Sequence, residues 1–188
     1  MRWLAGMSAL ALLAVTTAVS ADEIKSGLQP GQSIGAFDVK KCAGASEDGV
    51  SVDQTLCYRC KYGMRPMVMV FARSADDSLA SVVKQLDSAV AKNSEKQLKA
   101  FVNILGEDRK ALEATAKDFG SKNNFANVPI VVPEESDNGP ENYGINPKAA
   151  VTVIVAAGGK VKASHGFTGA PDENAVKQIL NEVNDALN

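Results

Sequence analysis

The chain contains 188 residues with a formal net charge of −2, and 45% of its residues are hydrophobic. This charge balance shows no basic excess, so we expect no nucleic-acid partner and no binding to an anionic membrane surface. The length corresponds to one domain, which is long enough to bury a hydrophobic core without the help of disulfide bonds.

The N-terminal segment 1–21 has the layout of a secretory signal. Arg2 precedes an apolar stretch from Leu4 to Val15, and small residues follow as far as Ala21. This pattern predicts cleavage between Ala21 and Asp22. The apolar stretch is short for a membrane span, so a retained membrane anchor is the less favoured alternative. We therefore expect an exported protein, periplasmic or extracellular, with no membrane segment once the signal is removed.

The segment after the signal, residues 22–34, is polar and contains glycine and proline, which predicts a flexible leader. A single domain is then expected over residues 35–188. Alternating apolar and polar residues at 36–40 predict a half-buried strand. Turn residues at 44–49 predict that the chain returns at 50–52 as a hairpin.

The remaining predicted elements alternate between strands and helices. The apolar run at 66–72 predicts a strand buried on both faces, and apolar residues at helical spacing predict a helix over 74–92. The later predicted segments are strands at 100–105, 128–132, 150–155 and 161–167, and helices at 108–119 and 171–187. This order predicts an α/β domain with a mixed, mostly parallel sheet, helices on both faces and an N-terminal β-hairpin extension.

Two segments carry a resemblance to a known family. The first is RPMVMVFAR (65–73), which runs into the predicted helix, and the second is YGINPKAAVTVIVAAGGKV (143–161). With this element order, the chain resembles the thioredoxin superfamily, and more closely the branch with an added strand that contains peroxiredoxins and exported TlpA-like thioredoxins. The resemblance covers residues 36–187 and implies a thioredoxin-like three-layer sandwich.

The usual active-site residues of that family are absent. The family places its reactive cysteine at the N-terminus of the helix after the central strand. That place falls near Asp76, and the second cysteine's place falls near Leu79, so Ser74, Asp76 and Asp77 occupy this helix end instead. We interpret these three residues as a capping box; the alternative is that Asp76 or Asp77 acts as an acid, a base or a metal ligand. The family's cis-proline position is Val151, so a trans peptide bond is expected there.

Cys57 and Cys60 form a Cys-x-x-Cys motif, which is a redox motif when it opens a helix after a strand. Here the motif precedes the central strand, at the end opposite the family's active site, so we favour a structural disulfide. Cys42, Cys57 and Cys60 allow three different single bridges, and the sequence leaves the pairing open. The alternative is thiol–disulfide exchange by Cys57 and Cys60, because the basic residues between positions 59 and 65 favour thiolates.

A metal site is the third interpretation of the cysteines. The three thiols and His165, the only histidine, would make a Cys3His set by number. Nothing in the sequence places His165 near the cysteines, so no metal and no cofactor are expected.

The sequence thus favours an exported thioredoxin-fold protein that acts as a non-catalytic binding or accessory module with structural cysteines. The alternative function is a thiol–disulfide oxidoreductase that uses the relocated Cys57–Cys60 pair. The sequence leaves enzyme activity undecided, and a protein partner of unknown identity is compatible with either function.

Overall fold

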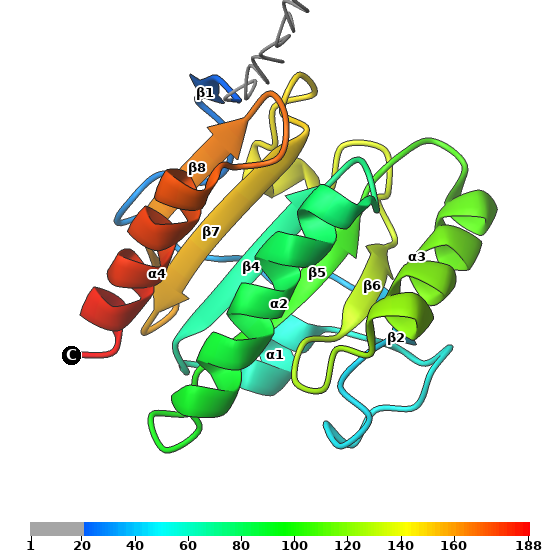
Figure 1. Ribbon diagram of the computed structural model, residues 1–188, viewed down its shortest axis with the longest axis horizontal. Coiled ribbons are helices and arrows are strands. Elements are labelled where there is room, and N and C mark those ends of the chain that lie inside the picture. Colours follow the sequence, from blue (N-terminus) through cyan, green and yellow to red (C-terminus); the bar gives the residue numbers. More distant parts are fainter. Residues whose placement is uncertain (1–20) are drawn as a thin grey trace, which may run out of the picture.

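The computed structural model describes residues 21–188, and residues 1–20 of the predicted signal lie outside this range. Within the described residues, eight strands form one sheet in the order β1-β8-β7-β4-β5-β6-β2-β3 (Figure 1). The strands are β1 (Glu23–Ile24), β2 (Val39–Ala43), β3 (Thr55–Leu56), β4 (Met67–Ala72), β5 (Lys99–Ile104), β6 (Ile130–Pro133), β7 (Val151–Ala157) and β8 (Lys160–Phe167). The helices are α1 (Tyr58–Tyr62), α2 (Asp77–Lys92), α3 (Arg109–Asn123) and α4 (Glu173–Ala186), with a 3-10 turn η1 (Glu141–Tyr143).

The sheet is mixed, and the prediction that it is mostly parallel is wrong. Among the described strands, only β4 with β5 and β5 with β6 pair in parallel, because these are the pairs joined by crossover helices. After β6 the chain crosses to the other side of β4, where β7 pairs with β4 in the antiparallel direction. The β7–β8 and β2–β3 hairpins add further antiparallel pairs. An N-terminal hairpin is present, but its strands are β2 and β3, and the predicted return at 50–52 is wrong because those residues form no strand.

Three long helices cover one face of the sheet. Figure 1 shows α2, α3 and α4 in front of the strands, and their buried side chains pack with Val68, Val70 and Ala72 of β4. The opposite face packs against α1, η1 and the extended chain around Ile34 and Phe37. Helices therefore lie on both faces, but the second layer contains only a five-residue helix and a three-residue 3-10 turn among the residues described.

The sequence signals for the centre of the fold are confirmed. All six residues of β4 are buried, as expected for an apolar strand that is covered on both faces. The apolar stripe of α2 is also buried, and it consists of Leu79, Val82, Val83, Leu86 and Val90. The side chains of β4 and α2 supply much of the larger core cluster, and their packing fixes the position of α2 against the sheet.

The segment 22–34, expected to be a flexible leader, is ordered against the rest of the fold. Its strand β1 pairs with β8, and the hydroxyl groups of Ser26 and Thr152 are hydrogen-bonded at 2.6 Å. Ile34 is buried in the core on the α1 side of the sheet. The polar composition did not reveal this packing, because several of the contacts are made through the backbone and the hydroxyl group of Ser26, and the buried apolar residues of the segment are isolated in the sequence.

Among residues 21–188, no helix combines the length and apolarity needed to cross a bilayer.

Candidate functional site

The two cysteines of the Cys-x-x-Cys motif are joined in a disulfide bond. Cys57 is the N-cap of α1, and the Cα atoms of Cys57 and Cys60 are 5.2 Å apart. The backbone N–H of Cys60 donates a hydrogen bond to the sulfur of Cys57 over 3.0 Å. This pairing resolves the choice between three bridges that the sequence left open, and Cys42 keeps a free thiol.

The motif opens a helix after a strand, which the sequence analysis missed. Strand β3 ends at Leu56, and α1 begins at Tyr58, so Cys57 lies between them. A five-residue helix shows too few turns to produce a visible apolar period, and β3 has only two residues. The spacing of the cysteines was the only local signal for this helix.

The disulfide lies far from the position at which this kind of fold would place a cysteine after the central strand. Helix α1 lies at the end where β4 begins, and the backbone N–H of Gly158 in the β7–β8 turn donates to the carbonyl of Met64 just after α1. Helix α2 begins at the other end of β4 and on the opposite face of the sheet. Six residues of strand separate the two ends by about 20 Å.

At that other end, the side chains predicted to form a helix cap are engaged in structural contacts. Asp76, rather than Ser74, is the N-cap of α2, and its carboxylate accepts the backbone N–H of Leu79 at 2.9 Å. Asp77 forms an ion pair with Lys122 at 2.9 Å, and the hydrogen bond from Lys122 lowers the pKa of Asp77. No thiol lies at this helix end.

The loops around this end also lack the family's other active-site feature. Within the described range no peptide bond is cis, and Val151 is in the trans form as expected. Arg73, which follows β4 directly, donates hydrogen bonds to the carbonyls of Ala149 and Asp137 and to the side chain of Asn138. The guanidinium thus ties together the loops in which a thioredoxin-type site would otherwise lie.

Helix α1 is held in place by two buried tyrosines. Tyr58 and Tyr62 both pack on the ring of Phe101 in β5. The hydroxyl of Tyr58 donates to the carboxylate of Asp48, and burial together with this hydrogen bond raises the pKa of Tyr58. The same carboxylate accepts a hydrogen bond at 2.7 Å from the ammonium group of Lys41, whose side chain is 1% exposed.

The surroundings of the disulfide are basic and open to solvent. Cys60 is exposed and Cys57 is partly exposed. Arg59 and Lys61 flank Cys60, and Arg65 donates a hydrogen bond back to the carbonyl of Lys61. Positive charge in the neighbourhood of a cysteine stabilises its thiolate, so the basic residues that flank Cys60 in the sequence favour thiol–disulfide exchange once a reductant reaches the disulfide.

The third cysteine is in a different environment. Cys42 is buried in the core on the helix-covered face, and burial raises the pKa of its thiol to about 11. A thiol with this pKa is almost entirely protonated at neutral pH, so Cys42 is a poor nucleophile.

The residues of the possible Cys3His set are not brought together. The two ring nitrogens of His165 are hydrogen-bonded to two carboxylates, Glu23 at 2.8 Å and Glu182 at 2.6 Å, and the protonated ring donates to both. Burial opposes the charged imidazolium, but the hydrogen bonds to both carboxylates outweigh it and raise the pKa of His165. Within residues 21–188, no cluster of His, Cys, Asp or Glu is arranged to hold a metal ion.

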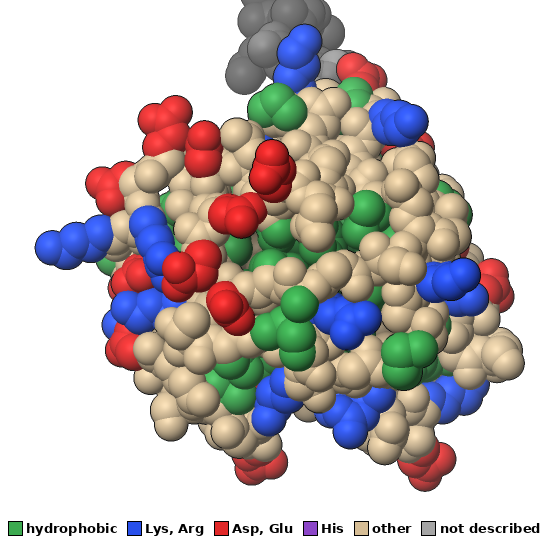
Figure 2. Space-filling model, turned by 180° about the vertical axis from the view of Figure 1, so that it is seen from behind, with side chains coloured by type: hydrophobic (Ala, Val, Ile, Leu, Met, Phe, Trp, Pro, Cys, Tyr) green, Lys and Arg blue, Asp and Glu red, His purple; other side chains and the backbone are tan. Residues whose placement is uncertain are grey.

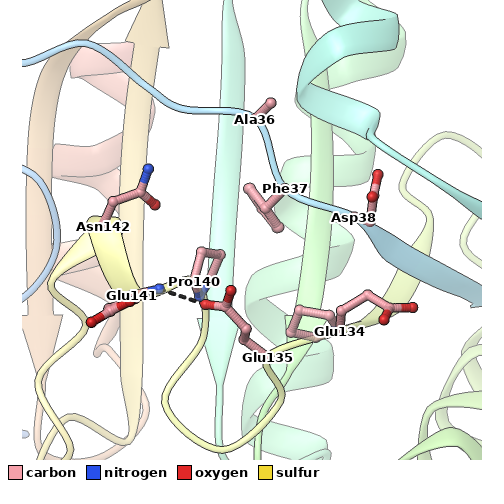
Figure 3. Close-up of a pocket in the computed structure, with 9 residues that line it drawn as sticks. Ala36, Phe37, Asp38, Glu134, Glu135, Pro140, Glu141 and Asn142 are labelled. Atoms are coloured by element: carbon pink, nitrogen blue, oxygen red, sulfur yellow. Dashed lines mark hydrogen bonds between the residues drawn. The ribbon is translucent and has the colours of Figure 1, made fainter.

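A second surface feature is an acidic hollow that the sequence analysis did not identify. The hollow has a volume of about 700 Å³ and contains the partly exposed ring of Phe37. Figure 3 shows the side chains around it, including the hydrogen bond from the backbone N–H of Glu141 to Glu135. Its four acidic side chains are Asp38, Glu134, Glu135 and Glu141. Asp38 is distant in the sequence from the other three, so only the folded chain reveals the hollow.

The fold of this chain is similar to those of solved structures, whereas its sequence matches no family model or curated protein. A putative thiol:disulfide interchange protein DsbE from Chlorobium tepidum is similar, with a TM-score of 0.62, 16% identity and coverage of 86% of this chain and 99% of that chain. AhpC from Mycobacterium tuberculosis has a TM-score of 0.57 at 9% identity, with coverage of 86% and 99%.

A third solved structure gives the same result. A putative protein disulfide isomerase from Bacteroides thetaiotaomicron has a TM-score of 0.57 at 13% identity, with coverage of 90% of this chain and 94% of that chain. The chain therefore has a thioredoxin-like fold, as the resemblance in the sequence implied.

Proposed function

We propose that this protein is a thiol–disulfide exchange protein whose redox centre is the Cys57–Cys60 pair. The observation that carries this proposal is that the pair forms an exposed disulfide at the start of a helix, with the Cys57 sulfur accepting the backbone N–H of Cys60. The same hydrogen bond stabilises Cys57 as a thiolate when the disulfide opens.

The small size of the disulfide loop argues against a mainly structural role. The bridged residues are separated by three positions, and loop-closure entropy predicts a stabilisation of about 2 kcal/mol for so short a loop. Helix α1 is already fixed by the buried rings of Tyr58 and Tyr62. A disulfide that adds little to stability and lies at the surface is better suited to reversible chemistry.

The proposed reaction is an exchange between this disulfide and a dithiol of a partner. A partner thiolate attacks the exposed sulfur of Cys60, the Cys57–Cys60 bond breaks, and the electron pair leaves on the sulfur of Cys57. The second partner thiolate then attacks the partner's own sulfur in the mixed disulfide and releases Cys60. The partner is oxidised by two electrons to a disulfide, and the protein is reduced to two thiols.

Single-turnover exchange with a dithiol peptide tests this proposal. Wild-type protein is expected to oxidise the peptide at a one-to-one ratio, and both Cys57→Ser and Cys60→Ser are expected to abolish the reaction. When Cys57→Ser is given the oxidised form of the peptide instead, its Cys60 thiolate is expected to attack the peptide disulfide and to accumulate as a mixed disulfide, visible by mass spectrometry, because no Cys57 remains to resolve it. Cys42→Ser is the matched control and should react like wild type, because Cys42 is buried. A native disulfide that dithiols do not reduce would contradict the proposal.

The second candidate function is the non-catalytic binding or accessory module. It is favoured by the replacement of the usual thioredoxin site with Asp76, Asp77 and the hydrogen bonds of Arg73. In this case the Cys57–Cys60 bond serves only to hold α1. The two candidates predict different responses to a reductant. A purely structural disulfide should resist reduction until the protein unfolds, whereas an exchange-active disulfide should be reduced while the protein stays folded.

Export to the periplasm or the extracellular space is part of the same proposal. It is supported by the signal-like N-terminal sequence and by the disulfide bond, which persists in oxidising compartments. The N-terminal sequence of the protein isolated from its native compartment tests this point, and a chain that starts at Asp22 is expected.

A further inference from the structure

Basic residues surround the disulfide, and their charges are not neutralised by the protein itself. In the part of the chain that the structure describes, Arg59, Lys61 and Arg65 form no ion pair. Arg59 donates to the carbonyl of Ile34 at 3.1 Å, and Arg65 donates to the side-chain carbonyl of Gln97 at 3.3 Å, so both have neutral acceptors. Some other cations of the described residues are paired with carboxylates, namely Lys40, Lys41, Arg109, Lys117 and Lys122, while others, such as Lys110, also form no ion pair.

A hollow beside α1 provides a contact surface next to these basic residues. Its volume is about 540 Å³, and its lining includes Lys61, Met64 and Arg65, with no acidic residue. Met64 is 64% exposed, which is unusual for a large apolar side chain. The hydrogen bond from Arg65 to the carbonyl of Lys61 folds the guanidinium across the last turn of α1. The hollow thus offers an apolar contact between two cations, a few residues from Cys60.

We propose that the partner of the Cys57–Cys60 disulfide is a protein segment whose cysteine is flanked by acidic residues. This inference rests on the proposed exchange function and names the class of its substrate. Acidic residues next to the partner cysteine reach the cations around Cys60 within one Debye length, which is about 10 Å at 0.1 M salt. Attraction over this distance raises the rate of encounter and orients the partner thiolate toward Cys60.

The charge on the rest of the same face supports this partner. Figure 2 shows Asp and Glu side chains gathered on the upper left of the face, and Lys and Arg side chains more frequent toward the lower end, where β4 begins. The acidic hollow that contains Asp38 and Glu141 belongs to the end opposite α1. An acidic segment is therefore repelled from one end of the face and attracted to the end that holds the disulfide.

Two peptides of equal length test the inference: one has glutamates on both sides of a single cysteine, and the other has lysines. The rate at which each forms a mixed disulfide with the protein is divided by its rate with a neutral small-molecule disulfide, which corrects for the different thiol pKa values. At low ionic strength, the corrected rate of the acidic peptide should exceed that of the basic peptide by about tenfold. The difference should shrink toward zero at high salt. Equal corrected rates at low salt would overturn the inference.

Charge-reversal variants locate the effect. The double variant Lys61→Glu with Arg65→Glu should reverse the preference between the two peptides. Lys110→Glu is the matched control, because Lys110 is an exposed cation of α3 on the other face, and it should leave the preference unchanged. A preference that survives the double variant would show that these cations do not select the partner.

Peptides with serine in place of cysteine separate this inference from the exchange function. Nuclear magnetic resonance should show shifts of the amide signals of residues 58–66 with the acidic serine peptide and not with the basic one. If this binding is found while no peptide undergoes exchange, the partner chemistry stands and the proposed function fails. If exchange occurs without charge preference and no binding is seen, the proposed function stands and the inference fails.

Discussion

The hydroxyl of Tyr58 donates a hydrogen bond to the carboxylate of Asp48, and this contact joins helix α1 to the loop between β2 and β3. Tyr58 is fully buried and directly follows Cys57 in the chain. Asp48 in turn accepts the ammonium group of Lys41 and the backbone N–H of Val50. The position of the disulfide is therefore set by a buried polar network rather than by apolar packing alone.

Removing the hydroxyl of Tyr58 should destabilise the protein. In Tyr58→Phe, the carboxylate of Asp48 loses a partner while it stays mostly buried, and we expect a loss of about 1–3 kcal/mol in the free energy of unfolding. Tyr62→Phe is the matched control, because Tyr62 lies on the same helix and its hydroxyl has no hydrogen bond to residues 21–188. Urea denaturation measures both variants. Equal losses in the two variants would mean that the bond to Asp48 adds nothing.

Reduction of the disulfide should have a small effect on stability. Because the Cys57–Cys60 loop is so short, we expect reduction to lower the free energy of unfolding by about 2 kcal/mol or less. Urea denaturation with and without dithiothreitol measures this difference, and Cys42→Ser under the same conditions controls for effects of the free thiol. A protein that unfolds on reduction would instead support the structural role of the disulfide.

The cap of α2 should contribute to stability and not to exchange. Asp76→Ala removes the side-chain acceptor for the backbone N–H of Leu79, and we expect a loss of about 1 kcal/mol. Asp77→Asn should cost much less, because the ion pair of Asp77 with Lys122 is exposed to solvent. Thermal unfolding compares the two variants. If either variant loses thiol exchange while it stays folded, this helix end has a role in the reaction.

The stability of the protein should depend on pH through His165. Its pKa in the folded protein is raised from the ordinary value of 6.5, because the hydrogen bonds to Glu23 and Glu182 outweigh burial. The protonated imidazole therefore stabilises the fold fully below pH 6.5, and this stabilisation is lost as the pH rises through the raised pKa.

The variant His165→Gln should flatten the stability profile above pH 6.5, as measured by urea midpoints at several pH values. Glu23→Gln, which removes one of the two carboxylates, should reduce the pH dependence without abolishing it. The chain contains no second histidine. An unchanged profile in His165→Gln would therefore mean that the pH dependence of stability comes from groups other than histidine.

The parts of the fold with long, regular patterns could be predicted from the sequence. The apolar run of β4 and the repeated apolar positions of α2 have signals that extend over several residues, and burial follows directly from them. Strand direction could not be read in the same way, because an apolar strand has the same pattern in either orientation. The placement of β7 beside β4 depends on where the chain crosses the sheet, and no local pattern specifies that path.

Only part of the candidate site could be predicted from the sequence. The spacing of Cys57 and Cys60 identified the residues, but a helix as short as α1 has no period to reveal it. No sequence pattern connects Lys41, Asp48 and Tyr58, which are joined by hydrogen bonds only in the folded chain. Charged residues such as Lys41 and Asp48 are usually at the surface, so their burial was not expected. The prediction of a structural disulfide therefore rested on the position of the motif before β4, and the helix that the motif opens was not predicted.

The ordered segment 22–34 has a consequence for how the protein behaves at high concentration. The long strand β8 would otherwise be an open edge, but Gly31 and Gln32 exchange backbone hydrogen bonds with Val161, and Glu23 and Ile24 pair with its far end. The other edge of the sheet is β3, which has two residues. Both edges thus end in very short or irregular segments, which disfavours edge-to-edge pairing of two copies and protects the fold against fibril-like aggregation.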